Sequence, residues 1–153
     1  MKNSVKGNMY EVALDETWEL FGPYLDGARA ALVCAVSGHP LSARGRAALE
    51  SSAEALGYGR RSCTYASLDD GLDPSALFLL LEGLDPLCLV ATDEAAARAI
   101  GQTYRCRIEP MKASRAFGRT VVAFRDFDAM LDDAQDKQVA WALLKKLPHF
   151  GER

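Results

Sequence analysis

Short apolar runs that alternate with helix-like stretches constrain this fold more than any other feature of the sequence. Residues 30–36 and 87–91 are continuous apolar runs, residues 120–124 are apolar after Thr120, and all three are too short for typical buried helices. Runs of this kind are typical of strands that are covered on both faces of a sheet. Residues 62–67 form a further strand candidate. Because the stretches between these runs have helical periodicity, the pattern predicts an α/β fold.

The helical stretches carry recognisable start and stop signals. Leu14, Trp18, Phe21 and Leu25 share one helical face, although Gly22-Pro23 offers that helix an earlier end. Asp73 is expected to cap a helix that has proline at its first position, and Thr92 or Asp93 to cap the next one. Gly57 fits a left-handed helix end. The predicted helices cover residues 14–25, 42–56, 73–84, 93–104 and 128–147, the last with a break near Asp132.

The segment between the last two predicted helices is less regular. Residues 105–108 fit either a short strand or an extended lead-in, and both interpretations stay open. Residues 109–119 contain proline, glycine and several basic side chains, and they are predicted to be a loop.

Helical crossovers between successive strands give parallel pairing. We therefore expect one domain, a three-layer α/β/α sandwich around a central, mainly parallel sheet of four strands. In such sheets ligands bind beyond the carboxyl ends of the strands. The candidate cleft lies at these ends and comprises Ser37, Gly38, His39, Pro40, Tyr65, Ser67, Arg125 and Asp126, with Asp69, Asp70, Thr92 and Asp93 nearby.

Two of these positions have competing interpretations. His39 fits a general acid or base beside Ser37, but a turn histidine that hydrogen-bonds the backbone is the favoured interpretation. Arg125 and Asp126 fit a polar pair that lines the cleft, or else Asp126 or Asp128 caps the following helix.

The net charge excludes a strongly basic nucleic-acid coat, because 18 Lys and Arg face 21 Asp and Glu. The charges are unevenly distributed: residues 98–125 hold seven basic side chains and one acid, whereas residues 69–94 hold seven acids and no base. The basic segment fits a phosphate backbone, or alternatively a solvated loop neutralised by the acidic segment. The candidate nucleic-acid contacts are Arg44, Arg46, Lys112, Arg115 and Arg119.

Metal and cofactor signals are missing from the sequence. The four cysteines, at positions 34, 63, 88 and 106, form no Cys-x-x-Cys pair, and the two histidines are far apart. Neither a phosphate-loop nor a dinucleotide fingerprint occurs. No apolar run approaches the roughly 20 residues of a membrane span, and no secretory signal core follows the first residues. We therefore expect no metal, no cofactor and no membrane partner, and a cytoplasmic location.

Several segments together resemble the uracil-DNA glycosylase superfamily. A proline precedes a buried strand and an alanine-rich helix follows it, and the tail resembles the closing strand, catalytic loop and last helix of that family. The resemblance implies a uracil-DNA glycosylase-like fold with strand order 2-1-3-4. It spans roughly residues 30–147 and rests on 37–57, 86–100, 118–131 and 137–147.

The functional residues of that family do not carry over. Its water-positioning loop has an acidic or amide side chain, where this chain has Ser37-Gly38-His39. Its base-recognition asparagine is missing, because no asparagine occurs after residue 8. Its late His-Pro pair is replaced by Arg125-Asp126. No catalytic residue is therefore assigned, and the cysteines are not clustered as in family members with an iron–sulfur cluster.

The sequence thus predicts a non-catalytic domain on a uracil-DNA glycosylase-like scaffold, acting as a binding or interaction module. Its partner is DNA, a nucleotide or a protein, and the sequence leaves this choice open. The first alternative is a diverged enzyme of the superfamily that acts in DNA repair and uses His39 or Arg125. The second is an enzyme of unrelated chemistry that binds a small ligand in the same cleft.

Overall fold

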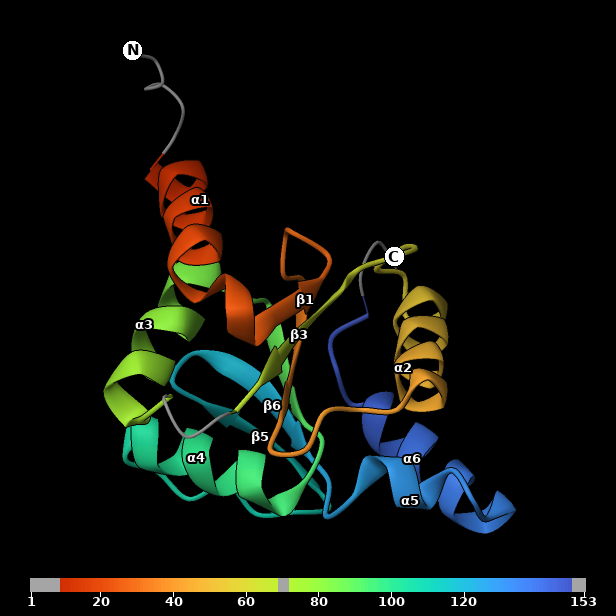
Figure 1. The fold of residues 1–153 in the computed structure, drawn as a ribbon. Coiled ribbons are helices and arrows are strands. Elements are labelled where there is room, and N and C mark those ends of the chain that lie inside the picture. Colours follow the sequence, from red (N-terminus) through yellow and green to blue (C-terminus); the bar gives the residue numbers. More distant parts are fainter. Residues whose placement is uncertain (1–8, 69–71, 150–153) are drawn as a thin grey trace.

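The computed structural model describes residues 9–68 and 72–149, and its helices and strands alternate along the chain (Figure 1). Asp69 and Asp70 of the predicted cleft rim lie outside the described residues. The elements in chain order are α1 (Met9–Phe21), η2 (Gly22–Tyr24), β1 (Leu25–Gly27), β2 (Val33–Ser37), α2 (Ala43–Ala55), β3 (Cys63–Ser67), α3 (Pro74–Leu84), β4 (Cys88–Ala91), α4 (Glu94–Tyr104), β5 (Lys112–Ala116), β6 (Arg119–Ala123), α5 (Phe127–Met130) and α6 (Ala134–Leu144).

The strands form one sheet in the order β1-β3-β2-β4-β6-β5. Strands β3, β2, β4 and β6 pair in parallel, as helical crossovers require. Strands β1 and β5 flank them and pair antiparallel to β3 and β6. The α/β class and the mainly parallel sheet are as predicted, but the expected count of four strands is wrong because it omits both edges.

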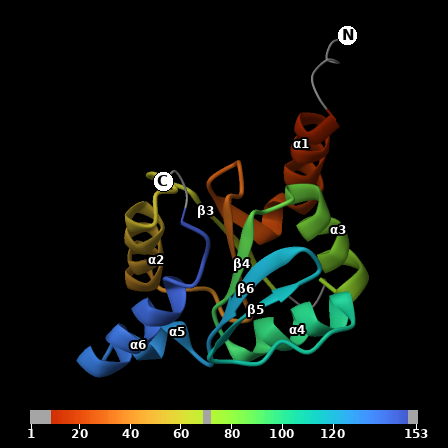
Figure 2. The ribbon, with the colours of Figure 1, turned by 180° about the vertical axis from the view of Figure 1, so that it is seen from behind.

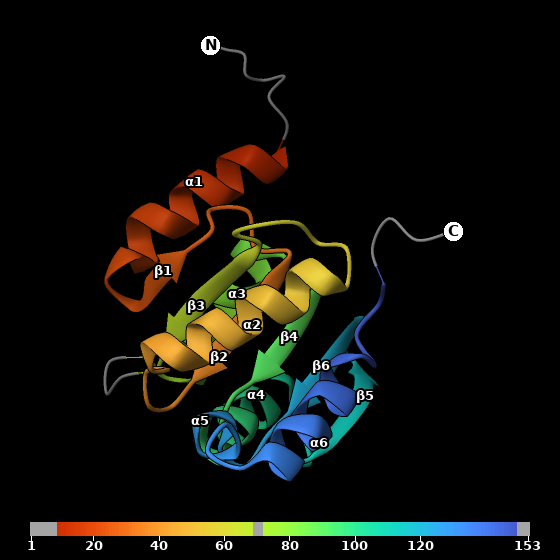
Figure 3. The ribbon, with the colours of Figure 1, turned by 90° about the vertical axis from the view of Figure 1, so that its right-hand side faces the viewer.

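Helices cover both faces of the sheet (Figures 1 and 3). Successive strand residues point to opposite faces, so that Cys34 and Val36 join one core and Val33 and Ala35 the other. Helices α1, α3 and α4 pack on the first face, and α2, α5 and α6 on the second. Every residue of β2, β4 and β6 is buried. This two-sided burial explains why the sequence of these strands is mainly apolar without alternation.

The two edge strands correct the sequence-based interpretation. The predicted helix 14–25 ends at Phe21, a 3-10 turn follows, and Leu25 starts β1. The predicted loop 109–119 contains β5, which forms a hairpin with β6 (Figure 2). Residues 105–108 form no strand in the described structure. Edge strands bury little, so β1 and β5 lack the apolar patterns that identify strands in a sequence.

The β5–β6 turn explains why the hairpin is hard to recognise. Phe117 and Gly118 have φ values of +41° and +83°, which is the backbone of a two-residue type I′ turn. Asn-Gly is the usual sequence of this turn, and a phenylalanine in its first central position is uncommon. Tyr104 stacks on the Phe117 ring, with 3.7 Å between the ring centroids, and thereby holds the turn against α4.

Three buried thiols give the stability of this fold a defined pH dependence. Burial raises the pKa of Cys34 and of Cys63 from 9.0 to about 12, and that of Cys88 to about 11. Above pH 9 the unfolded chain therefore releases protons that the folded chain retains, and the free energy of unfolding falls as the pH rises towards 12.

We expect urea titrations at increasing pH to show this decline above pH 9. A Cys34→Ala variant removes one of the three thiols, and its decline should be shallower than that of the unmodified protein. Constant stability between pH 9 and pH 11 would contradict the prediction.

Candidate functional site

The carboxyl edge of the sheet is organised by the carboxylate of Asp93, which follows β4. Both oxygens of Asp93 accept the N–H of Gly38 at 3.0 Å, and one also accepts the N–H of His39 at 2.9 Å. Asp93 is also the N-cap of α4, because it accepts the N–H of Ala96 at 2.9 Å. One carboxylate therefore joins the loop after β2 to the start of α4. The predicted cap is confirmed, and its link to the β2 loop is an additional role.

A second carboxylate, that of Asp128 in α5, joins this helix to the loop after β2. Asp128 accepts hydrogen bonds from the backbone N–H of Ser42 at 2.9 Å and from its hydroxyl at 2.8 Å. Ser42 is itself the N-cap of α2 and accepts the N–H of Gly45 at 3.0 Å. A Cβ at position 45 would lie 2.1 Å from a carboxylate oxygen of Asp128, so glycine is needed for this approach.

Polar groups nearer the strand ends are bonded within the fold. The Thr92 hydroxyl donates to that of Ser37 at 2.6 Å, and both residues are buried. Asp126 is the N-cap of α5 and accepts the N–H of Ala129 at 3.1 Å, as one sequence interpretation predicted. The hollow left between these loops has a volume of about 190 Å³ and is lined by His39, Pro40, Leu41, Thr92, Asp93, Asp126 and Asp128.

The remaining predicted cleft residues do not line this hollow. Tyr65 is buried, donates its hydroxyl to Glu50 at 2.9 Å and lies 4.3 Å beneath the guanidinium of Arg46. Burial, together with Glu50, raises the pKa of Tyr65. Ser67 pairs in register with Ser37. Arg125 forms an exposed ion pair with Glu94 at 3.7 Å. The structure thus places His39, Pro40 and Asp126 in the lining of one small hollow. Ser37 and Gly38 are hydrogen-bonded to the lining residues Thr92 and Asp93, whereas Tyr65, Ser67 and Arg125 lie outside the lining.

The five basic residues proposed from sequence lie in different parts of the fold. Arg44 pairs with Asp132 and Arg46 with Asp26, both near the start of α2. In the hairpin, Lys112 pairs with Ala123 at the carboxyl end of β6, whereas Arg115 pairs with Thr120 near its amino end.

Arg119 is 8% exposed, and its side chain makes contacts within the fold. It donates to the Pro86 carbonyl at 2.8 Å, to Asp85 at 2.8 Å and to Glu82 at 3.2 Å. Its guanidinium therefore binds acids of α3 and of the turn after it. Arg119 also lines a hollow of about 460 Å³ at this amino edge of the sheet.

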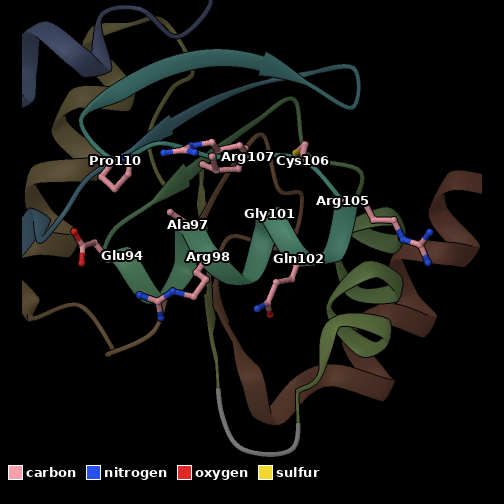
Figure 4. Close-up of a pocket in the computed structure, with 10 residues that line it drawn as sticks. Glu94, Ala97, Arg98, Gly101, Gln102, Arg105, Cys106, Arg107 and Pro110 are labelled. Carbon is pink, nitrogen blue, oxygen red and sulfur yellow. The ribbon is translucent and has the colours of Figure 1, made fainter.

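A larger hollow lies between α4 and the segment that follows it (Figure 4). Its volume is about 790 Å³, and its lining includes Arg98, Gln102, Arg105, Cys106 and Arg107. None of these residues was singled out as a site from sequence. The one sequence feature that indicates this hollow is the basic segment 98–125, because its first three arginines line the hollow. We call this hollow the arginine groove.

Residues 9–68 and 72–149 bring together no group of three or more His, Cys, Asp or Glu side chains that could hold a metal ion. Among the described helices, none has the length and apolar character to cross a membrane.

Neither a scan against protein-family models nor a search of curated proteins finds a match to this chain.

Proposed function

We propose that this protein is a non-catalytic domain on a uracil-DNA glycosylase-like scaffold, and that it acts as a binding module for nucleic acid. The observation that carries the non-catalytic part of the proposal is the use of the carboxylates at the carboxyl edge of the sheet. Asp93, Asp126 and Asp128 each accept backbone N–H groups of the loops and helix ends around them.

This use of the carboxylates argues against hydrolysis at the edge. A glycosylase must position a water molecule, read the edge of a flipped base and stabilise an anionic leaving group. Asp93 already accepts three backbone N–H groups, and Asp126 and Asp128 accept one each, so these oxygens are occupied as structural acceptors. The edge hollow of about 190 Å³ is also below the roughly 300–1,000 Å³ of typical ligand pockets.

The scaffold assignment is supported by the resemblance in the sequence and by the order of the parallel strands. The four strands of the sheet interior follow the order β3-β2-β4-β6, which is the order 2-1-3-4 when they are numbered along the chain. Fold alone does not give function, so the binding assignment depends on charge. Arg98, Arg105 and Arg107 line one hollow, and a local basic surface of this kind attracts phosphate even on a protein of net charge −3.

The test measures binding and chemistry in the same samples. We expect labelled single- or double-stranded DNA to bind with an affinity that falls as the salt concentration rises, because counterions are released from the phosphates. We expect no release of free uracil when the DNA contains it. Fluorescence anisotropy measures binding, and chromatography of the released base measures chemistry.

His39→Ala and Arg125→Ala variants are the matched controls, because both side chains are exposed and lie near the carboxyl edge. Release of uracil by the unmodified protein, lost in either variant, would refute the non-catalytic assignment and favour a diverged repair enzyme. Absence of DNA binding at low salt would refute the nucleic-acid assignment and favour a protein partner.

A further inference from the structure

The arginine groove is bounded by two different parts of the chain. Arg98 and Gln102 project from α4, whereas Arg107 and Pro110 belong to the segment that runs alongside the helix (Figure 4). The guanidinium groups of Arg98 and Arg107 lie towards the Pro110 end of the groove, and Arg105 lies at the other end, where α4 stops. The groove therefore presents positive charge from both of its sides.

A glycine allows the segment to lie this close to the helix. A Cβ at Gly101 would lie 2.7 Å from the carbonyl oxygen of Cys106, which is closer than real Cβ contacts come. The N–H of Cys106 donates to the Gly101 carbonyl at 2.9 Å and fixes the turn. Arg105 has a φ of +56°, and this left-handed residue ends the helix. The groove is thus a built feature of the backbone.

Its positive charge is weakly opposed. Within the described part of the chain, Arg98 and Arg105 form no ion pair. Glu94 is the one acid in the lining, and its carboxylate pairs with Arg125 at 3.7 Å. Arg107 pairs with Glu109 at 3.2 Å, but both side chains are exposed, and such a pair contributes little. A ligand can therefore recruit Arg107 at small cost.

The groove also offers contacts that a simple ion does not use. Ala97, Gly101 and Ile108 form a buried apolar floor beneath the arginines, and the half-buried Pro110 borders it. The backbone N–H groups of Arg107 and Ile108 donate to no acceptor within residues 9–68 and 72–149. These two N–H groups are therefore left for water or a ligand. The volume of about 790 Å³ falls within the range of small-molecule sites.

We propose that the arginine groove binds a nucleotide unit, with its phosphate held between Arg98 and Arg107. A phosphate carries up to two negative charges and several acceptor oxygens, which match two guanidinium forks better than one carboxylate does. The volume of the groove leaves room for the sugar and the ring beside its apolar floor. The unit belongs either to a free nucleotide or to a nucleic-acid strand. This inference rests on the proposed function and adds to it a place and a ligand class.

Cys106 provides a direct probe of occupancy. It lines the groove and is the one exposed cysteine, whereas Cys34, Cys63 and Cys88 are buried. We expect ATP to slow alkylation of Cys106 by iodoacetamide, as followed by mass spectrometry of the native protein. At an ATP concentration about ten times its Kd, the rate should fall about tenfold. Adenosine, which lacks the phosphates, should protect far less, and oligothymidylate distinguishes a strand from a free nucleotide.

Two substitutions test the phosphate contacts. Arg98→Ala and Arg107→Ala should each raise the Kd for ATP about tenfold, as measured by calorimetry. Arg60→Ala is the matched control, because Arg60 also forms one exposed ion pair, with Glu54 at 3.9 Å, but lies outside the groove. Its Kd should be unchanged. Arg98 and Arg107 are both exposed, so their replacement should leave the unfolding midpoint within error.

Three results would overturn the inference. The first is an alkylation rate that neither ATP nor oligothymidylate changes at millimolar concentration. The second is equal protection in the Arg98→Ala/Arg107→Ala double variant. The third is protection by polyglutamate without protection by ATP, which would indicate an acidic peptide. None of these measurements involves uracil release. A negative result for ligand binding in the groove therefore leaves the non-catalytic assignment in place. Conversely, uracil release would refute the non-catalytic assignment and would leave the inference about the groove unchanged.

Discussion

Replacing Asp93 by alanine is expected to lower the free energy of unfolding by about 3 kcal/mol, because three backbone donors lose their acceptor together. The N–H groups of Gly38, His39 and Ala96 all bind this carboxylate. Hydrogen bonds to a charged acceptor contribute about 1.5–3 kcal/mol each, and partial access of water to the site reduces their sum. The loop after β2 and the start of α4 would lose their common anchor.

Urea or thermal unfolding measures this effect, and the midpoint temperature should fall by roughly 6–12 °C for a chain of this size. Asp126→Ala is the control, since Asp126 caps α5 through the N–H of Ala129, and its loss should cost about 1 kcal/mol. Asp93→Asn keeps an N-cap oxygen and should fall between the two variants. Equal losses in Asp93→Ala and Asp126→Ala would show that the link to the β2 loop contributes nothing.

Replacing Arg119 by alanine is expected to cost about 2–3 kcal/mol, because the guanidinium neutralises two acids and satisfies a carbonyl. Without it, Glu82 and Asp85 lose the cation that they share, and the Pro86 carbonyl loses its donor. The two acids are 42% and 62% exposed at their side chains, so water offsets part of the loss.

Arg115→Ala is the matched control on the same hairpin. Arg115 is exposed, and its contacts are a 3.2 Å hydrogen bond to Thr120 and a 3.3 Å bond to the Gly118 carbonyl. Its replacement should change stability by less than about 0.5 kcal/mol. Arg119→Lys retains the charge but not the planar fork, and its loss should be intermediate. A loss in Arg115→Ala as large as that in Arg119→Ala would contradict the interior role of Arg119.

Local signals in the sequence predicted much of the fold because each of them depends on its neighbours in the chain. Asp73 caps α3 through the N–H of Ala76, and Gly57 has the positive φ expected after α2. The break near Asp132 is confirmed between α5 and α6. The edge strands were missed because β5 is largely exposed, so its sequence need not alternate. The tight turn at Phe117 was hidden by an unusual residue in a left-handed position.

The candidate site is less apparent from the sequence than the fold is. The sequence shows the basic residues of 98–125 as one group. Which of these side chains are buried and which are exposed depends on neighbours far away in the chain. Arg119 meets Glu82 and Asp85, which are 37 and 34 residues distant. Arg98 and Arg107 approach one groove because α4 ends at a left-handed Arg105 and the chain turns back along Gly101. Nothing in the local pattern distinguishes these arginines.

The alternation of helices and strands and the parallel interior of the sheet follow from local sequence, because burial on both faces and helix capping act over a few residues. Which charges remain available to a ligand depends on contacts that form only in the folded chain. Asp93 and Arg119 are committed to partners more than 30 residues away, whereas Arg98 has none in the described chain. The physical reason is that the strength of a charge at a site depends on its burial and on its neighbours in space, and neither property is a local feature of the chain.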